Sequence, residues 1–127
     1  MNKKKKNKKI LMVEGDAFTR KVYKDELDKL GFTYSEATNG VEGLNKVLYE
    51  KPDLVLLDVV LPIKNGFELL REMKEKKETK KIPVVILSNL GSENNIKTGL
   101  SLGAEEYLVK TETDFVSVIS IIKKILK

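Results

Sequence analysis

Apolar residues along this chain follow two alternating patterns. Short apolar runs of strand length predict three buried strands, at Ile10–Val13, Leu54–Leu57 and Val84–Leu87. Two further segments, 32–37 and 105–109, give weaker strand signals. Between and after the strands, apolar residues recur at helical spacing over 18–30, 41–50, 65–77, 92–102 and 114–126. Five strand–helix pairs in strict alternation predict an α/β fold, a (βα)5 doubly wound parallel sheet with helices on both faces.

Polar residues follow four of these five strands. They are Glu14 and Asp16 after the first strand, Asp58 after the third, Ser88 after the fourth and Lys110 after the fifth. Taken singly, each has a plainer interpretation as a helix cap, a turn residue or a solvated lysine. Because the carboxyl ends of parallel strands meet at one edge of the sheet, we expect these side chains to lie together.

Their chemistry suits phosphoryl transfer. Clustered carboxylates repel one another unless a cation is present, and their oxygens suit a hard divalent ion such as Mg²⁺. A lysine and a hydroxyl beside them complete a pocket for a phosphoryl group. The carboxylate of Asp58 can itself act as a nucleophile and form an acyl phosphate.

Composition excludes several other classes of function. The chain has 127 residues, which suits one domain, and contains neither cysteine nor histidine. Disulfides, thiol nucleophiles, zinc–thiolate sites and Ser-His-Asp catalysis are therefore excluded. There is no apolar run of membrane-spanning length and no apolar signal core, so we expect a cytoplasmic protein without membrane contact.

The net charge of +5 comes from one end of the chain. Six lysines lie within the first nine residues, and the rest of the chain is close to neutral. Such a run is usually solvated, so we predict a disordered basic tail over residues 1–8 and a single domain over 9–127. No base-reading motif accompanies the tail, and we expect no nucleic-acid partner for this domain.

Four segments together are specific to one family. They are ILMVEGD, PDLVLLDVVLPIKNG, IPVVILS and GAEEYLVK. From Lys9 to Lys127 the chain resembles the receiver (CheY-like) domain of bacterial two-component response regulators. The resemblance implies a flavodoxin-like sheet with strand order 2-1-3-4-5, and a protein that accepts a phosphoryl group rather than an enzyme. At most, it implies self-phosphorylation from small donors and self-dephosphorylation.

The resemblance also implies roles for individual residues. Asp58 is the phosphoacceptor, Ser88 the switch hydroxyl, Lys110 the phosphoryl-binding cation and Tyr107 the switch aromatic. Glu14, Asp58 and the backbone carbonyl of Val60 fall on positions that hold Mg²⁺, with Glu14 acting largely through water. The implied partners are a histidine kinase or phosphotransfer protein, and a downstream protein or a second copy. The latter would bind the face formed by segments 92–102, 105–109 and 114–126, which Leu90, Ile96, Leu100 and Tyr107 help to shape.

Three residues depart from the family pattern. Gly15 occupies the position of the acid that binds Mg²⁺ directly, so the metal site should be weaker unless Asp16 substitutes for it. Asn89, after the switch hydroxyl, is larger than the usual small residue and should crowd the pocket entrance. Thr111 replaces a proline whose peptide bond is usually cis, and a cis bond without proline costs about 3 kcal/mol. The resemblance therefore does not fix the placement of Lys110.

Two functional hypotheses follow. In the first, the chain is a phosphorylation-controlled switch, which the retention of Asp58, Ser88 and Lys110 favours. In the second, it is a degenerate receiver that binds a partner without phosphorylation, which Gly15 favours. A flavin- or nucleotide-binding protein of similar architecture is disfavoured, because no glycine-rich phosphate loop follows the first strand.

Overall fold

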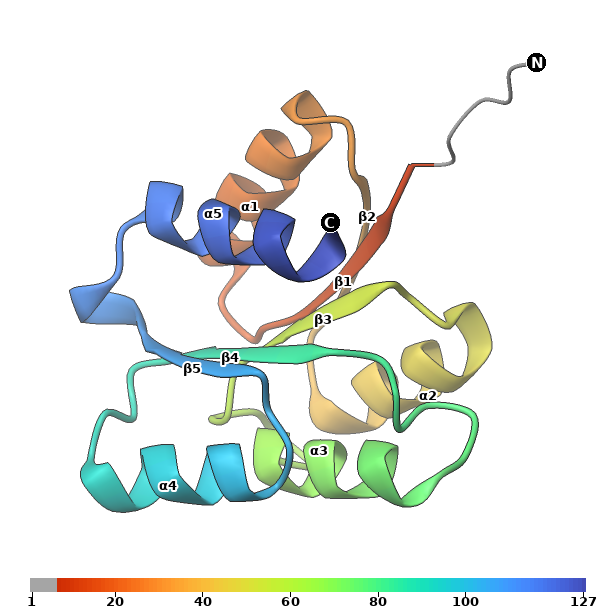
Figure 1. The fold of residues 1–127 in the computed structure, drawn as a ribbon, viewed down its shortest axis with the longest axis vertical. Helices are drawn as coiled ribbons and strands as arrows, with labels where there is room; N and C mark the ends of the chain where they lie inside the picture. Colours follow the sequence, from red (N-terminus) through yellow and green to blue (C-terminus); the bar gives the residue numbers. More distant parts are fainter. Residues whose placement is uncertain (1–6) are drawn as a thin grey trace.

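The computed structural model describes residues 7–127, which form a regular alternation of strands and helices (Figure 1). The strands are β1 (Lys9–Val13), β2 (Thr33–Ala37), β3 (Leu54–Leu57), β4 (Val84–Ser88) and β5 (Glu106–Val109). The helices are α1 (Ala17–Lys29), α2 (Gly40–Glu50), α3 (Gly66–Glu75), α4 (Glu93–Ser101), the 3-10 helix η1 (Lys110–Glu112) and α5 (Phe115–Leu126). Every predicted element is present, with ends shifted by a residue or two.

The five strands form one parallel sheet in the order β2-β1-β3-β4-β5. β1 pairs with both β2 and β3, so that Ile10 lies opposite Tyr34 on one side and Leu54 on the other. This topology confirms the predicted α/β doubly wound fold and its strand order. It also brings the carboxyl ends of β1, β3, β4 and β5 to the same edge of the sheet.

Each face of the sheet has its own apolar core, because successive strand residues point to opposite faces. Leu11 and Val13 of β1 pack on the side of α2 and α3, whereas Ile10 and Met12 pack against α1 and α5. Figure 1 shows α1 and α5 above the sheet, with α2, α3 and α4 below it. With helices on both faces, the central strands are almost fully buried and hold their terminal residues in a rigid frame.

The apolar spacing of α1 predicts only some of the residues that this helix buries. Phe18 and Leu30 fit the helical pattern, but they are 75% and 44% exposed and do not belong to the core. The buried residues of this helix are Tyr23 and Leu27, and the Tyr23 ring packs against Phe115 of α5. The buried aromatic ring of this helix is therefore that of Tyr23 and not that of Phe18.

The helices begin at short polar side chains that bind free backbone amides of the first turn. Asp16 caps α1 through the amide of Thr19, and Asp114 caps α5 through the amide of Ser117. Asn65 and Glu68 form a reciprocal capping box at the start of α3. These caps fix where each helix leaves the functional edge of the sheet.

The amino-terminal segment is described only in part. Of the tail predicted over residues 1–8, residues 1–6 lie outside the described part of the chain, while Asn7 and Lys8 belong to no helix or strand. None of the helices described between residues 7 and 127 has the length and apolar character needed to cross a membrane. The cytoplasmic location stays a prediction.

Candidate functional site

The carboxyl edge of the sheet carries an open pocket of about 480 Å³. It is lined by Glu14, Gly15, Asp16, Thr19, Asp58, Val60, Asn89 and Lys110. The structure thus brings together the predicted residues that follow β1, β3 and β5, which lie far apart in the sequence. Asn89 is exposed and lies in the lining, as expected from its position after Ser88.

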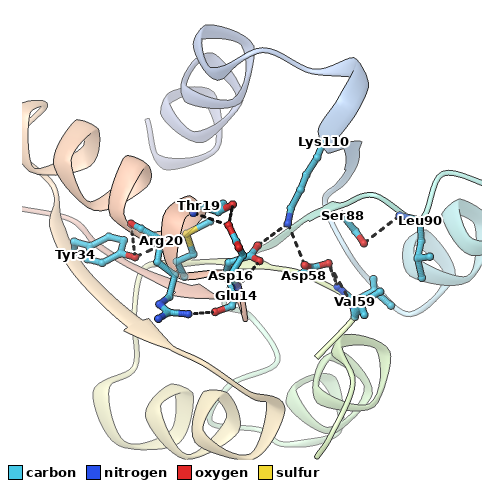
Figure 2. Close-up of polar contacts among 12 residues, drawn as sticks. Glu14, Asp16, Thr19, Arg20, Tyr34, Asp58, Val59, Ser88, Leu90 and Lys110 are labelled. Carbon is cyan, nitrogen blue, oxygen red and sulfur yellow. Dashed lines mark hydrogen bonds and ion pairs between the residues drawn. The ribbon is translucent and has the colours of Figure 1, made fainter. Parts of the chain in front are cut away.

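Lys110 connects two acids at the centre of this site (Figure 2). Its Nζ atom donates to Glu14 Oε1 at 2.8 Å and to Asp58 Oδ2 at 3.1 Å. The bond between Lys110 and Thr111 is trans, since residues 7–127 contain no cis peptide bond. The lysine therefore reaches both carboxylates with Thr111 in place of the proline that usually follows it in receiver domains.

Asp58 is a buried carboxylate that its own loop holds in place. Only 8% of the residue is exposed. Its Oδ1 atom accepts hydrogen bonds from the amides of Val59 and Val60, at 2.7 and 3.3 Å, which leaves Oδ2 to Lys110. Behind it, a Cβ atom on Gly66 would lie only 2.2 Å from the Asp58 carbonyl oxygen, so the start of α3 rests directly on this peptide.

Glu14 is the more deeply buried acid, at 3% exposure. Burial raises its pKa, although the hydrogen bonds from Lys110 and from the amide of Asp16 act in the opposite direction. For Lys110, burial acts to lower the pKa, but the hydrogen bond to Glu14 and the charge of Asp58 outweigh it and raise the pKa. Lys110 therefore stays a cation at neutral pH and offsets the charge of the two carboxylates.

Ser88 and Tyr107 meet at the backbone of Leu90. The Ser88 hydroxyl is fully buried and accepts a hydrogen bond from the Leu90 amide at 3.3 Å, and Figure 2 shows it pointing toward Leu90. The Tyr107 hydroxyl donates to the Leu90 carbonyl at 2.6 Å. One peptide segment of the β4–α4 loop therefore links the two predicted switch residues.

Gly99 has a packing role that its helix propensity did not suggest. A Cβ atom at this position would lie 2.7 Å from the Tyr107 ring and 2.8 Å from Ile86. The glycine lets α4 lie close to β5, with the Tyr107 ring in the space that a side chain would fill. Nearby, Ile96 is half-buried and Leu100 is 46% exposed, so this face carries apolar surface that a partner could cover.

The donor set suits a Mg²⁺ ion, but only weakly. Mg²⁺ in proteins is commonly held by one or two carboxylates and keeps several waters. Glu14, Asp58 and Val60 line the pocket and are the residues that could hold such an ion, whereas Gly15 has no side-chain ligand to offer. Within residues 7–127, no three Asp, Glu, His or Cys side chains lie close enough to hold an ion together.

Asp16 is engaged elsewhere. Its Oδ2 atom accepts from the amide and the hydroxyl of Thr19, at 2.9 and 2.7 Å, and the bond from the Thr19 hydroxyl is the main reason that its pKa is lowered. A carboxylate that caps α1 in this way is turned toward the helix. This geometry argues against Asp16 as the substitute for the acid missing at Gly15.

We expect Asp16→Asn to leave both the melting temperature and the Mg²⁺ dependence of any Asp58 modification nearly unchanged, because asparagine caps helices as well as aspartate does. Asp16→Ala should lower the melting temperature, since the Thr19 amide loses its acceptor. Thermal unfolding and magnesium titration of both variants check this. A weaker Mg²⁺ response in Asp16→Asn, at unchanged stability, would identify Asp16 as a ligand instead.

Arg20 belongs to this site, although sequence reasoning missed it. Its Nη1 atom donates to the Glu14 carbonyl at 2.9 Å. An arginine on the first turns of a predicted helix has no distinguishing spacing, so only its position near the first strand end could have suggested it. Thr19, which binds Asp16 and lines the pocket, was missed for the same reason.

Comparison with known proteins identifies the family of this chain. The sequence matches the response regulator receiver domain family over residues 10–122. The chain belongs to this family. Among its relatives by sequence, the chain is 36% identical over 102 residues to the transcriptional regulatory protein ResD of Bacillus subtilis. It is 37% identical over 103 residues to the phosphate regulon transcriptional regulatory protein PhoB of Pseudomonas aeruginosa.

These matches cover 80% and 81% of this receiver domain but only 41% and 45% of the two relatives, so the chain spans less than half of their length. Solved receiver domains match nearly the whole of this chain. The BeF3-activated receiver domain of Klebsiella pneumoniae RstA is 31% identical, with a TM-score of 0.86 and coverage of 94% of this chain and 98% of that one. A CheY-like receiver protein of Methanospirillum hungatei is 27% identical, with a TM-score of 0.88 and coverage of 95% and 94%.

Proposed function

We propose that this receiver domain accepts a phosphoryl group on Asp58 from a histidine kinase or phosphotransfer protein, and that the modification controls a partner-binding face. The observation that carries the proposal is the buried Asp58 carboxylate at the mouth of an open pocket, with the Lys110 ammonium 3.1 Å away. The RstA receiver domain, which has the same fold, was crystallised in a BeF3-activated form. That precedent supports a similar reaction here.

The chemistry requires a nucleophile and compensation of charge. A carboxylate oxygen of Asp58 attacks the phosphorus, a P–O bond forms, and the bond from phosphorus to the donor's nitrogen or oxygen breaks with its electron pair on the donor. The two backbone amides on Oδ1 fix the carboxylate so that it meets the donor in one orientation. Lys110 lies where it can bind the oxygens of the transferred group.

Mg²⁺ is the cofactor we propose, held by Glu14, Asp58 and the Val60 carbonyl. When bound, such an ion offsets the negative charge that builds up on the transferring group. With two carboxylates and no side chain at Gly15, the affinity should be lower than that of a site with a third acid. Lys110 neutralises part of the acidic charge and so reduces the repulsion between Glu14 and Asp58.

The second candidate function is a receiver that binds its partner without phosphorylation. Two observations favour it. Gly15 supplies no ligand, and Tyr107 already packs against Gly99 and donates to Leu90 in this structure. In both proposals, α4, β5 and α5 form the face for a downstream protein or a second copy, with Leu100 among its exposed apolar residues.

The deciding experiment is incubation with acetyl phosphate or beryllofluoride, with and without Mg²⁺. Intact mass should show one phosphoryl group in the wild type at millimolar Mg²⁺, and NMR should show changed signals near Tyr107. Asp58→Asn is the matched control, because it keeps the shape of the side chain while removing the nucleophile. It should take up no phosphoryl group. A wild type that shows neither modification nor spectral change would favour the second function.

A further inference from the structure

A series of polar contacts runs from the edge of the sheet to the proposed phosphoacceptor, and Figure 2 shows its members Tyr34, Arg20, Glu14, Lys110 and Asp58. It begins at Tyr34 and Glu36 on β2 and passes through Arg20 on α1 to Glu14. From Glu14 it continues through Lys110 to Asp58. The last three residues of the series, Glu14, Lys110 and Asp58, line the pocket. Tyr34, Glu36 and Arg20 do not line it.

Arg20 joins the two halves of this series with two different nitrogens. Nη1 donates to the Glu14 carbonyl at 2.9 Å, and Nε lies 3.3 Å from Glu36 Oε2. Only 16% of the Arg20 side chain is exposed and Glu14 is buried, so water screens the contact to Glu14 little, whereas the Glu36 side chain is 39% exposed and its ion pair is screened more. The contact of Nε with Glu36 is an ion pair without a hydrogen bond, whereas Nη1 forms one with Glu14. The planar guanidinium fixes the directions of the two contacts relative to each other, which the single ammonium of lysine cannot do.

Glu36 is in turn fixed by Tyr34. The Tyr34 hydroxyl donates to Glu36 Oε1 at 2.8 Å and lies 3.2 Å from the Arg20 carbonyl. Burial, followed by the hydrogen bond to Glu36, raises the pKa of Tyr34, so the hydroxyl keeps its proton and remains a donor. Residues of β2 therefore contact Arg20 at Nε and at its backbone carbonyl, while the terminal Nη1 atom binds the Glu14 carbonyl.

The acceptor of the Arg20 hydrogen bond, the Glu14 carbonyl, belongs to the peptide bond that precedes Gly15. Glycine has more backbone freedom than any other residue, so the backbone of the turn from β1 into α1 is least restricted at Gly15, directly after the buried Glu14. The Glu14 amide is fixed by the Ala37 carbonyl at 3.0 Å. On the other side of the residue, Arg20 fixes the carbonyl, and the Asp16 amide donates to Glu14 Oε2 at 3.0 Å. That last bond forms only while the turn keeps its shape.

We propose that Arg20 is a positioning residue for the phosphorylation site: it fixes the Glu14–Gly15 peptide, and through it the Glu14 carboxylate that orients Lys110 beside Asp58. Glu36 and Tyr34 support it from β2. The expected effect of Arg20 on phosphorylation rests on the proposed function of Asp58. The structural part, a flexible glycine turn fixed by one guanidinium, can be measured separately.

A double-mutant cycle between Arg20 and Gly15 tests the proposal. Alanine at position 15 fits, because its Cβ would meet nothing closer than the Thr38 carbonyl oxygen at 3.8 Å, and it would restrict the backbone. Arg20→Gln and Arg20→Lys are made in the Gly15 and the Gly15→Ala backgrounds. Lys24→Gln is the control, since Lys24 lies on the same helix but forms an exposed pair with Asp28.

Two quantities are measured in each variant. The first is hydrogen exchange of the Asp16 amide, which needs no phosphoryl donor or metal. The second is the initial rate of Asp58 modification by acetyl phosphate across a Mg²⁺ titration. With Gly15 present, both Arg20 variants should speed amide exchange and raise the half-saturating Mg²⁺ concentration, each about tenfold. In the Gly15→Ala background the same variants should change both quantities much less, and Lys24→Gln should change neither.

Equal effects of Arg20→Gln in both backgrounds would overturn the proposal, because they would show general destabilisation rather than control of the glycine turn. Unchanged amide exchange would overturn it as well. Thermal unfolding shows that each variant is folded at the measuring temperature, and the milder Arg20→Lys serves if Arg20→Gln is not. If the wild type takes up no phosphoryl group at all, the proposed function of Asp58 is wrong. The exchange rate of the Asp16 amide still decides the role of Arg20.

Discussion

Replacing Gly15 with aspartate is expected to lower the Mg²⁺ concentration that half-saturates Asp58 phosphorylation by about tenfold or more. The new carboxylate would join Glu14 and Asp58 in the pocket and provide the third acid that this site lacks. The backbone permits the change, because Gly15 is not in the left-handed region and an added Cβ would make only ordinary contacts, at 3.8 Å or more.

The measurement is a magnesium titration of acetyl phosphate-driven modification, followed by intact mass. Gly15→Ala is the matched control, because it restricts the same backbone without adding an oxygen ligand. We expect a large fall in the half-saturating Mg²⁺ concentration for aspartate and a small change for alanine. If aspartate and alanine act alike, backbone freedom rather than the missing ligand limits the site, and the argument for a weakened metal centre fails.

This comparison also separates the two candidate functions. A wild type that is inert at millimolar Mg²⁺, but becomes reactive with aspartate at position 15, would be a receiver fold whose phosphorylation chemistry was lost through one residue. A wild type that reacts slowly, and faster with aspartate, would be a working switch with a weak metal site. In both outcomes Asp58 keeps its direct contacts with the Val59 amide and with Lys110, because neither contact is made to Gly15.

The fold and much of the site could be predicted from the sequence, because both depend on short-range patterns. Buried strands such as Leu54–Leu57 appear as uninterrupted apolar runs, and a parallel sheet necessarily brings their carboxyl ends together. Glu14, Asp58 and Lys110 follow such strands directly, so their meeting is a consequence of topology. The structure shows the three in contact.

Features that depend on side-chain direction could not be predicted in this way. Phe18 fits the helical spacing of α1 but is 75% exposed, and the aromatic ring of this helix that packs against α5 is that of Tyr23. Arg20 and Glu36 are 16 positions apart on different elements, and nothing in either segment signals that they meet. Gly99 weakens a helix by its propensity, yet it is the residue that lets Tyr107 pack against α4.

Gly66→Ala is expected to lower the free energy of unfolding by about 3 kcal/mol or more, because the site has no room for a methyl group. The added Cβ would lie 2.2 Å from the Asp58 carbonyl oxygen and 2.8 Å from the Val59 Cα atom. Both are backbone atoms, so a change of rotamer cannot relieve the clash. The start of α3, whose Gly66 amide donates to the Val59 carbonyl at 2.9 Å, must move away from the strand end.

The same clash links stability to function, since the displaced peptide carries the phosphoacceptor. Urea unfolding should show the loss, with Gly15→Ala as the control that adds the same methyl group at an open position on the same edge of the sheet. At a temperature where Gly66→Ala is still folded, its modification by acetyl phosphate should be slower than that of the wild type. Normal modification in a destabilised variant would mean that α3 yields while Asp58 keeps its place, so that β3 and the amides of Val59 and Val60 alone orient the carboxylate.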